Sequence, residues 1–122
     1  MWRVFVVWVL ALSVGACSFH KSMGDIRAQN PVFSAVTAMS VEQFSSCFIL
    51  YMEEETGTHP TKYFLRQFED RTEIISDTTM GSISFILIAV PEPNGSSITL
   101  REGFSLEIKY ATEAIHACGG YE

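Results

Sequence analysis

The sequence predicts an α+β fold, with a small antiparallel sheet of three or four strands and an N-terminal and a C-terminal helix packed on one face. Three observations support this prediction. Apolar residues recur at helical spacing between positions 41 and 51. Runs rich in aromatic and β-branched residues then occupy much of positions 62–101, separated by turn residues. A second stretch with helical spacing closes the chain.

The first predicted helix begins after Ser40, because Ser40 and Gln43 have the spacing of a capping box. Its apolar face consists of Val41, Phe44, Cys47, Phe48 and Tyr51. The acids at 53–55 and then Gly57 end the helix. Acids are unfavourable at the negative end of a helix dipole, so we expect an exposed last turn. An acidic patch for a cation or a basic partner is the alternative.

Strands are expected between the helices, at residues 62–68, 72–76, 82–90 and 98–101. Residues 69–71 form either a turn or a bulge in one long strand. Segment 82–90 is almost wholly apolar and is therefore placed centrally, and the turn residues at 91–95 fold strand 98–101 back on it.

In the first of these strands, Phe64 and Phe68 alternate with Tyr63 and Leu65, so both strand faces carry apolar side chains. Two interpretations remain open. Either both faces are buried, or one forms an exposed patch that meets a partner.

The last element is ambiguous. Residues 106–110 alternate as a strand would, whereas one helical face would hold Ile108, Ala111, Ile115 and Cys118. We favour a helix over 106–118, with Ser105 as its cap and Gly119 and Gly120 as its stop.

The first sixteen residues have the features of a secretory signal: Arg3, an apolar stretch at 4–12 and small residues before Cys17. The apolar stretch is too short for a bilayer core, which needs about 20 helical residues. Val14-Gly15-Ala16-Cys17 resembles the lipobox of bacterial lipoproteins, although Leu is usual at the place of Val14. An ordinary secretory signal with an incidental cysteine, or an uncleaved anchor, is the alternative.

This resemblance implies cleavage before Cys17 and lipid on its thiol. Residues 1–16 would then be a signal peptide, 17–33 the lipidated cysteine and a tether, and 34–122 a single domain. A packed irregular segment is the alternative to the tether. Ser18, rather than Asp, after the cysteine implies the periplasmic face of a Gram-negative outer membrane.

Lipid on Cys17 leaves two of the three cysteines, Cys47 and Cys118, in an oxidising compartment. We expect a disulfide between them that clasps the two helices together over the sheet. Two buried free thiols or a metal site are the alternatives, but no His or Cys stands nearby at ligand spacing.

Charge and motifs narrow the function classes. Without the signal and its Arg3, the chain has seven Lys and Arg and fourteen Asp and Glu. So acidic a chain repels nucleic acid and anionic lipid headgroups, so we expect neither nucleic-acid binding nor membrane attachment through basic side chains. No ligand spacing links His20, His59 and His116 to other metal-binding side chains. Neither a G-x-S-x-G nucleophile motif nor a Gly-rich phosphate loop occurs, and a Cys47–His116 thiol enzyme conflicts with the expected disulfide. We therefore expect no enzyme, no cofactor and no metal.

Since no catalytic or metal-binding motif is present and a lipid anchor is expected on Cys17, we expect a membrane-anchored lipoprotein. It would act as a non-enzymatic interaction or assembly module of the envelope, bringing a sheet edge or open face to a protein partner. One alternative is a small-ligand-binding lipoprotein with a pocket between helices and sheet. Another is an accessory lipoprotein of a secretion, conjugation or phage-exclusion system.

Overall fold

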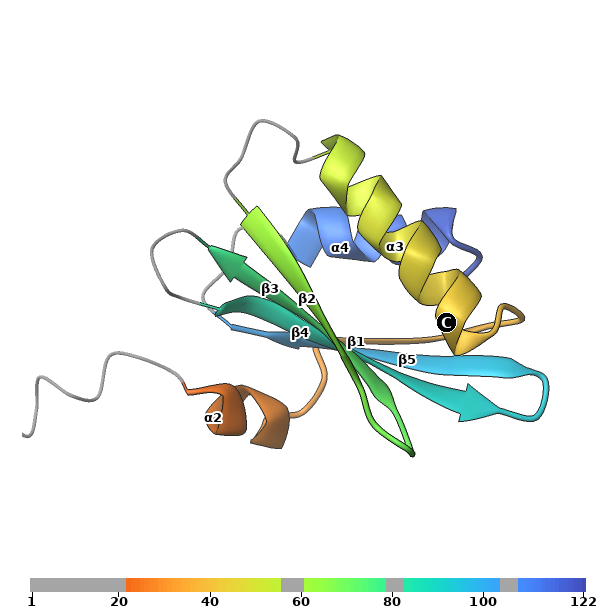
Figure 1. Cartoon of the computed structure of the whole chain (residues 1–122), viewed down its shortest axis with the longest axis horizontal. Helices are drawn as coiled ribbons and strands as arrows, with labels where there is room; N and C mark the ends of the chain where they lie inside the picture. The colour runs from red at the N-terminus through yellow and green to blue at the C-terminus, as the bar shows by residue number, and fades with distance from the viewer. Residues whose placement is uncertain (1–21, 56–60, 79–82, 104–107) are drawn as a thin grey trace, which may run out of the picture.

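The computed structural model describes residues 22–55, 61–78, 83–103 and 108–122. In these residues a five-stranded antiparallel sheet is flanked by three helices (Figure 1). The elements in chain order are α2 (Met23–Ala28), β1 (Phe33–Thr37), α3 (Val41–Glu55), β2 (Thr61–Gln67), β3 (Thr72–Thr78), β4 (Ile83–Glu92), β5 (Gly95–Glu102) and α4 (Ile108–Ala117). The α+β class is as predicted, but one strand and one helix were not expected.

The strand order is β1-β5-β4-β3-β2. Strands β2 to β5 form a meander in which each strand pairs with the next, and β1 joins it beside β5. Strand β4 is central, as its apolar sequence predicted. Strands β1 and β2 are consecutive in the chain but lie at opposite edges, because α3 carries the chain across the sheet between them.

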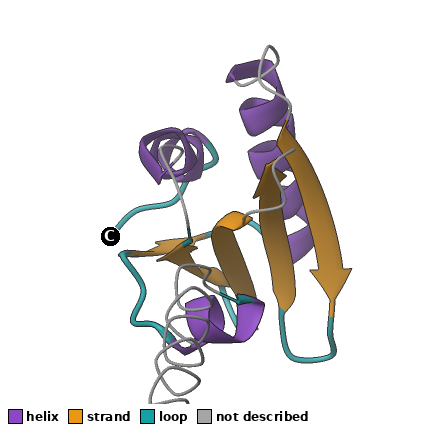
Figure 2. Cartoon of the chain, turned by 90° about the vertical axis from the view of Figure 1, so that its left-hand side faces the viewer, coloured by secondary structure: helices purple, strands orange, loops and turns teal. Residues whose placement is uncertain are grey.

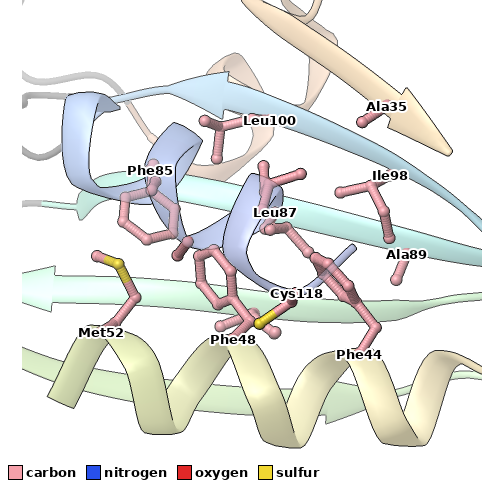
Figure 3. Packing of buried hydrophobic residues seen from close by; sticks show 14 of the residues in the cluster. Ala35, Phe44, Phe48, Met52, Phe85, Leu87, Ala89, Ile98, Leu100 and Cys118 are labelled. Atoms are coloured by element: carbon pink, nitrogen blue, oxygen red, sulfur yellow. The ribbon is translucent and has the colours of Figure 1, made fainter. Parts of the chain in front are cut away.

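Helices α3 and α4 cover one face of the sheet and enclose the main core. Phe44, Phe48 and Met52 of α3 are fully buried, and in Figure 3 they point toward Phe85 and Leu87 of β4. The capping box predicted at the start of α3 is present. The Gln43 N–H donates to the Ser40 hydroxyl (3.2 Å), and the Ser40 N–H donates to the Gln43 side chain (3.3 Å).

The predicted disulfide is confirmed. Cys47 on α3 is bonded to Cys118, one residue after the end of α4, and their Cα atoms are 5.9 Å apart. It therefore clasps the two helices together on the same side of the sheet. The ambiguous C-terminal segment is helical from Ile108 onward, while the expected cap at Ser105 lies outside the described residues.

The two predicted helices share one face of the sheet, but a third helix that the sequence analysis did not predict, α2, packs on the opposite face (Figure 1, Figure 2). Ile26 of α2 is fully buried against Ile75 of β3 and Ile86 of β4. A capping box starts the helix, with the Asp25 N–H donating to the Ser22 hydroxyl (3.1 Å). Residues 22–33, assigned to the tether from sequence, thus hold α2 and the first residue of β1.

The number of strands was underestimated because β1 has only five residues, with alternating burial. Its end approaches the β4–β5 turn so closely that Gly95 is required there. Gly95 has a φ of 145°, and a Cβ at this position would overlap with the carbonyl oxygen of Thr37.

Candidate functional site

Only some of the residues singled out from sequence belong to the described part of the chain. Cys17, His20 and His59 lie outside the described residues. His116 is exposed on α4, with its Nδ1 3.2 Å from the carbonyl oxygen of Gly120 and its ring against the Phe33 ring. In the part of the chain that the structure describes, no three His, Cys, Asp or Glu side chains are grouped as metal ligands would be.

The most unusual surface is the edge strand β2. Phe64 is 48% exposed, Leu65 44% and Phe68 44%, so the two-sided burial considered from sequence does not occur. Leu65 pairs with Ile74, which belongs to the core under α3 and α4, and therefore lies on that face. Phe64 pairs with Ile75, which packs under α2, and therefore lies on the opposite face. Both faces of one edge strand thus present large apolar side chains.

The hydrogen-bond pattern of the β2–β3 hairpin determines which backbone groups of β2 point away from β3. The Phe68 N–H donates to the carbonyl oxygen of Arg71 (2.8 Å), so even-numbered residues of β2 bond to β3. Odd-numbered residues direct their N–H and C=O groups away from β3, toward the outer edge of the sheet. Among the described residues, the outward groups of Leu65 and Gln67 have no hydrogen-bond partner.

On the α2 face, β2 and the turn after it alternate cations and aromatic rings, in the order Lys62, Phe64, Arg66 and Phe68. We call these four residues the alternating row. Within the described residues neither Lys62 nor Arg66 forms an ion pair. Phe68 already holds one cation, because the Arg71 guanidinium lies 4.3 Å from its ring centre.

A buried carboxylate explains why Arg66 has no acidic partner among the described residues. Glu73 stands directly opposite Arg66 in the sheet and is fully buried. Arg27 donates to it through Nε (3.0 Å) and Nη2 (2.6 Å), and the Nε of Arg71 is 3.4 Å away. Burial by itself raises the pKa of Glu73, but the hydrogen bonds and charges of Arg27 and Arg71 outweigh it and hold the pKa below its ordinary value.

The opposite edge of the sheet is closed by the chain itself. The Val36 N–H donates to the carbonyl oxygen of Tyr121 (2.9 Å), and the Tyr121 N–H donates to the carbonyl oxygen of Val36 (2.9 Å). The C-terminal residues therefore add a short bridge outside β1. No described residue does the same for β2.

A hollow of about 510 Å³ lies where the β2–β3 and β4–β5 turns approach the start of α3. Its polar lining includes Ser40, Glu42, Gln43, Glu69, Arg71 and Asn94. It is wide open and lies at the end of the sheet. The small-ligand alternative would place its pocket between helices and sheet, so the hollow is not assigned a ligand.

Sequence reasoning missed α2 and the cluster around Glu73. The spacing of Ser22 and Asp25 has the form of a capping box and could have indicated the helix. The burial of Glu73 had no such signal, because one charged residue between Thr72 and Ile74 reads as solvent-facing in an alternating strand.

The chain matches no protein-family model, no curated protein and no solved structure. None of the described helices has the length and apolar character needed to cross a membrane. The features that bear on function are therefore those of the chain itself, above all the β2 edge.

Proposed function

We propose that the chain is a lipid-anchored envelope protein, held through Cys17, whose domain is a non-enzymatic interaction module. It would bind its partner through the β2 edge. One observation carries the proposal: β2 exposes Phe64, Leu65 and Phe68 on its two faces and in the adjoining turn, at a sheet edge where the outward backbone groups of Leu65 and Gln67 lack partners among the described residues. A long apolar edge of this kind is a liability in a protein that works alone.

A partner that adds a strand beside β2 removes this liability. The new strand pairs with the outward N–H and C=O groups of Leu65 and Gln67. It also covers apolar surface on both faces at once. Burying the exposed half of a Phe side chain contributes about 1 kcal/mol, so Phe64 and Phe68 together supply a useful part of a modest affinity.

Anchoring would hold this edge close to the membrane. Only five chain steps separate Cys17 from Ser22, where the described structure begins. Fully extended, such a segment reaches about 18 Å. The partner of a domain on so short a tether must itself lie near the membrane surface, which favours another envelope protein. An accessory role in secretion, conjugation or phage exclusion would use the same surface.

The anchor is tested by the intact mass of the protein extracted from membranes. We expect a chain beginning at Cys17 with added acyl mass, and a Cys17→Ala variant that is neither processed at this site nor retained by the membrane. Two acyl chains bind a bilayer stably, whereas an unlipidated acidic domain has no comparable attachment. A Cys17→Ala variant that is processed and membrane-bound like the wild type would refute the anchor.

The β2 edge is tested by a photo-crosslinking residue placed at Leu65 in the full chain in living cells. We expect a discrete crosslinked product from position 65. A matched position, the 59% exposed Leu50 on α3, should give none. Adding Gln67→Pro should abolish the product, because proline removes an outward N–H of the edge without taking a bond from β3. Equal products from positions 65 and 50 would contradict the proposal.

A further inference from the structure

We infer that the partner of the β2 edge is a second copy of this chain, paired antiparallel about a two-fold axis at Leu65. The inference rests on the proposed function only in using the same edge. Three observations support it: the order of side chains in the alternating row, the set of β2 residues whose backbone groups point outward, and the face of the sheet on which α2 lies.

Strand geometry restricts the possible symmetric pairings to a few. In an antiparallel pair of identical strands, the two-fold axis is perpendicular to the sheet and passes beside one residue. The central positions of β2 and the alternating row offer three such residues, Phe64, Leu65 and Arg66. With the axis at Leu65, the outward groups of this residue bond directly to those of its mate.

The register centred on Leu65 places every cation of the alternating row opposite an aromatic ring. Phe64 faces Arg66 of the second copy, and Lys62 faces Phe68 of the second copy. By symmetry each contact occurs twice. These are non-hydrogen-bonded pairs, in which side chains approach most closely, with Cα atoms about 4.5 Å apart. Lys62 and Arg66 form no ion pair with a described residue, so both are available for cation–π contacts.

The neighbouring registers oppose like charges. An axis at Phe64 places Lys62 directly opposite Arg66 of the second copy. An axis at Arg66 places the two Arg66 side chains opposite each other, although Lys62 then meets Asp70. Like charges directly opposite in a sheet are destabilising. The row is therefore self-complementary in one register of the three.

The axis also suits two lipid anchors. A two-fold axis perpendicular to the sheet keeps the α2 faces of both copies on the same side. In each copy α2, the first described element after Cys17, lies on that side (Figure 1), so lipid on both Cys17 residues would enter the same bilayer. The contact of two seven-residue strands is small and would be weak between free molecules. Confinement to one membrane raises the effective concentration and compensates for this.

The register is tested by adding one cysteine at a time to the full-length chain. Each variant is oxidised mildly in intact membranes, and its dimer is measured on non-reducing gels. Leu65→Cys should give a dimer in high yield, because mates at this position have Cα atoms about 5.5 Å apart, within disulfide range. Gln67→Cys should not, because its mates are separated by about 13 Å. Val36→Cys, on the opposite edge with a similar exposure of 42%, serves as the matched control and should stay monomeric.

A dimer through Gln67→Cys or Val36→Cys equal to that through Leu65→Cys would overturn the inference, as would a Leu65→Cys chain that remains monomeric. If Leu65→Cys stays monomeric while the photo-crosslinker at position 65 still captures a different envelope protein, the inference falls and the proposed function stands. If neither experiment yields a product, both the inference and the proposed function are refuted.

A second measurement checks the facing pair itself. Phe64→Ala and Arg66→Ala should each weaken dimerisation of the detergent-extracted chain about 5- to 30-fold, because each removes the same two cation–π contacts. The double variant should be little weaker than either single one, since the contacts are already lost. Effects that simply multiply would show that these side chains do not face each other and would overturn the register.

Discussion

The two edges of the sheet differ in whether their outward backbone groups are hydrogen-bonded. At β1, Val36 and Tyr121 exchange two backbone hydrogen bonds, whereas at β2 no described residue bonds the outward groups of Leu65 and Gln67. The protected strand has five residues and the open one seven. Within the described residues, the shorter edge is therefore covered and the longer, more apolar edge is open. This contrast supports a binding role for β2, since the fold has a means of closing an edge and uses it only once among the described strands.

The largest expected effect comes from removing the disulfide that holds the C-terminus near β1. A Cys47→Ser/Cys118→Ser variant should lose about 4 kcal/mol of unfolding free energy, because the bond closes a loop with a sequence separation of 71. Urea denaturation of the oxidised and variant chains measures this. Hydrogen exchange at Val36 should accelerate more than at Leu65, because only the Val36 amide is protected by the C-terminal bridge. A loss below about 1 kcal/mol would show that helix packing alone holds α3 and α4 together.

A smaller effect is expected from deleting Tyr121 and Glu122. The deletion removes the two hydrogen bonds at Val36 and should cost about 1 kcal/mol, because exposed backbone bonds contribute little net stability. It should also convert β1 into a second open edge and add a concentration-dependent association. Amide exchange at Val36 and sedimentation of the purified chain measure the two effects. Tyr121→Ala is the matched control, since it keeps the backbone bonds. Unchanged exchange at Val36 would show that the bridge does not protect β1.

The smallest effect at neutral pH concerns Glu73, beside the open edge. Its pKa is lower in the folded chain than in the unfolded one, so the unfolded chain takes up the proton first as the pH falls. Its contribution to stability is complete above the unfolded pKa of about 4.3 and is lost as the pH falls through the folded pKa. Thermal unfolding between pH 7 and pH 3 should show this loss. A Glu73→Gln variant should lack this component of the pH dependence, and an identical pH profile for both chains would contradict the assignment.

The sequence predicted the elements whose periodicity is long and regular. Helix α3, the central strand β4 and the Cys47–Cys118 pair all followed from spacing and from the count of cysteines. The sequence of β2 also showed the feature on which the proposed interface depends, namely apolar residues at both odd and even positions. Only burial could decide between its two interpretations, because an exposed edge and a buried centre have the same composition.

The features that the sequence did not predict are short or depend on distant partners. Strand β1 has too few residues for its alternation to stand out, and it is defined by pairing with β5. Helix α2 has six residues and is held by Ile26 and by the ion pair between Arg27 and Glu73. A helix this short has little stability of its own, so tertiary contacts override the local signal.

The crossing of α3 over the sheet has a consequence for the order in which the domain can form. Strand β1 precedes the meander in the chain, yet it pairs with β5, and its outer side is completed by Tyr121 near the end. If the chain is exported N-terminus first, β1 emerges early and waits for β5 and Tyr121 before its partners arrive. Contacts so distant in sequence form slowly. The meander of β2 to β5 can assemble meanwhile, and such a chain would then have two open sheet edges until β1 pairs with β5. Closure of β1 by Tyr121 would then leave β2 as the only edge still available to a neighbour among the described strands.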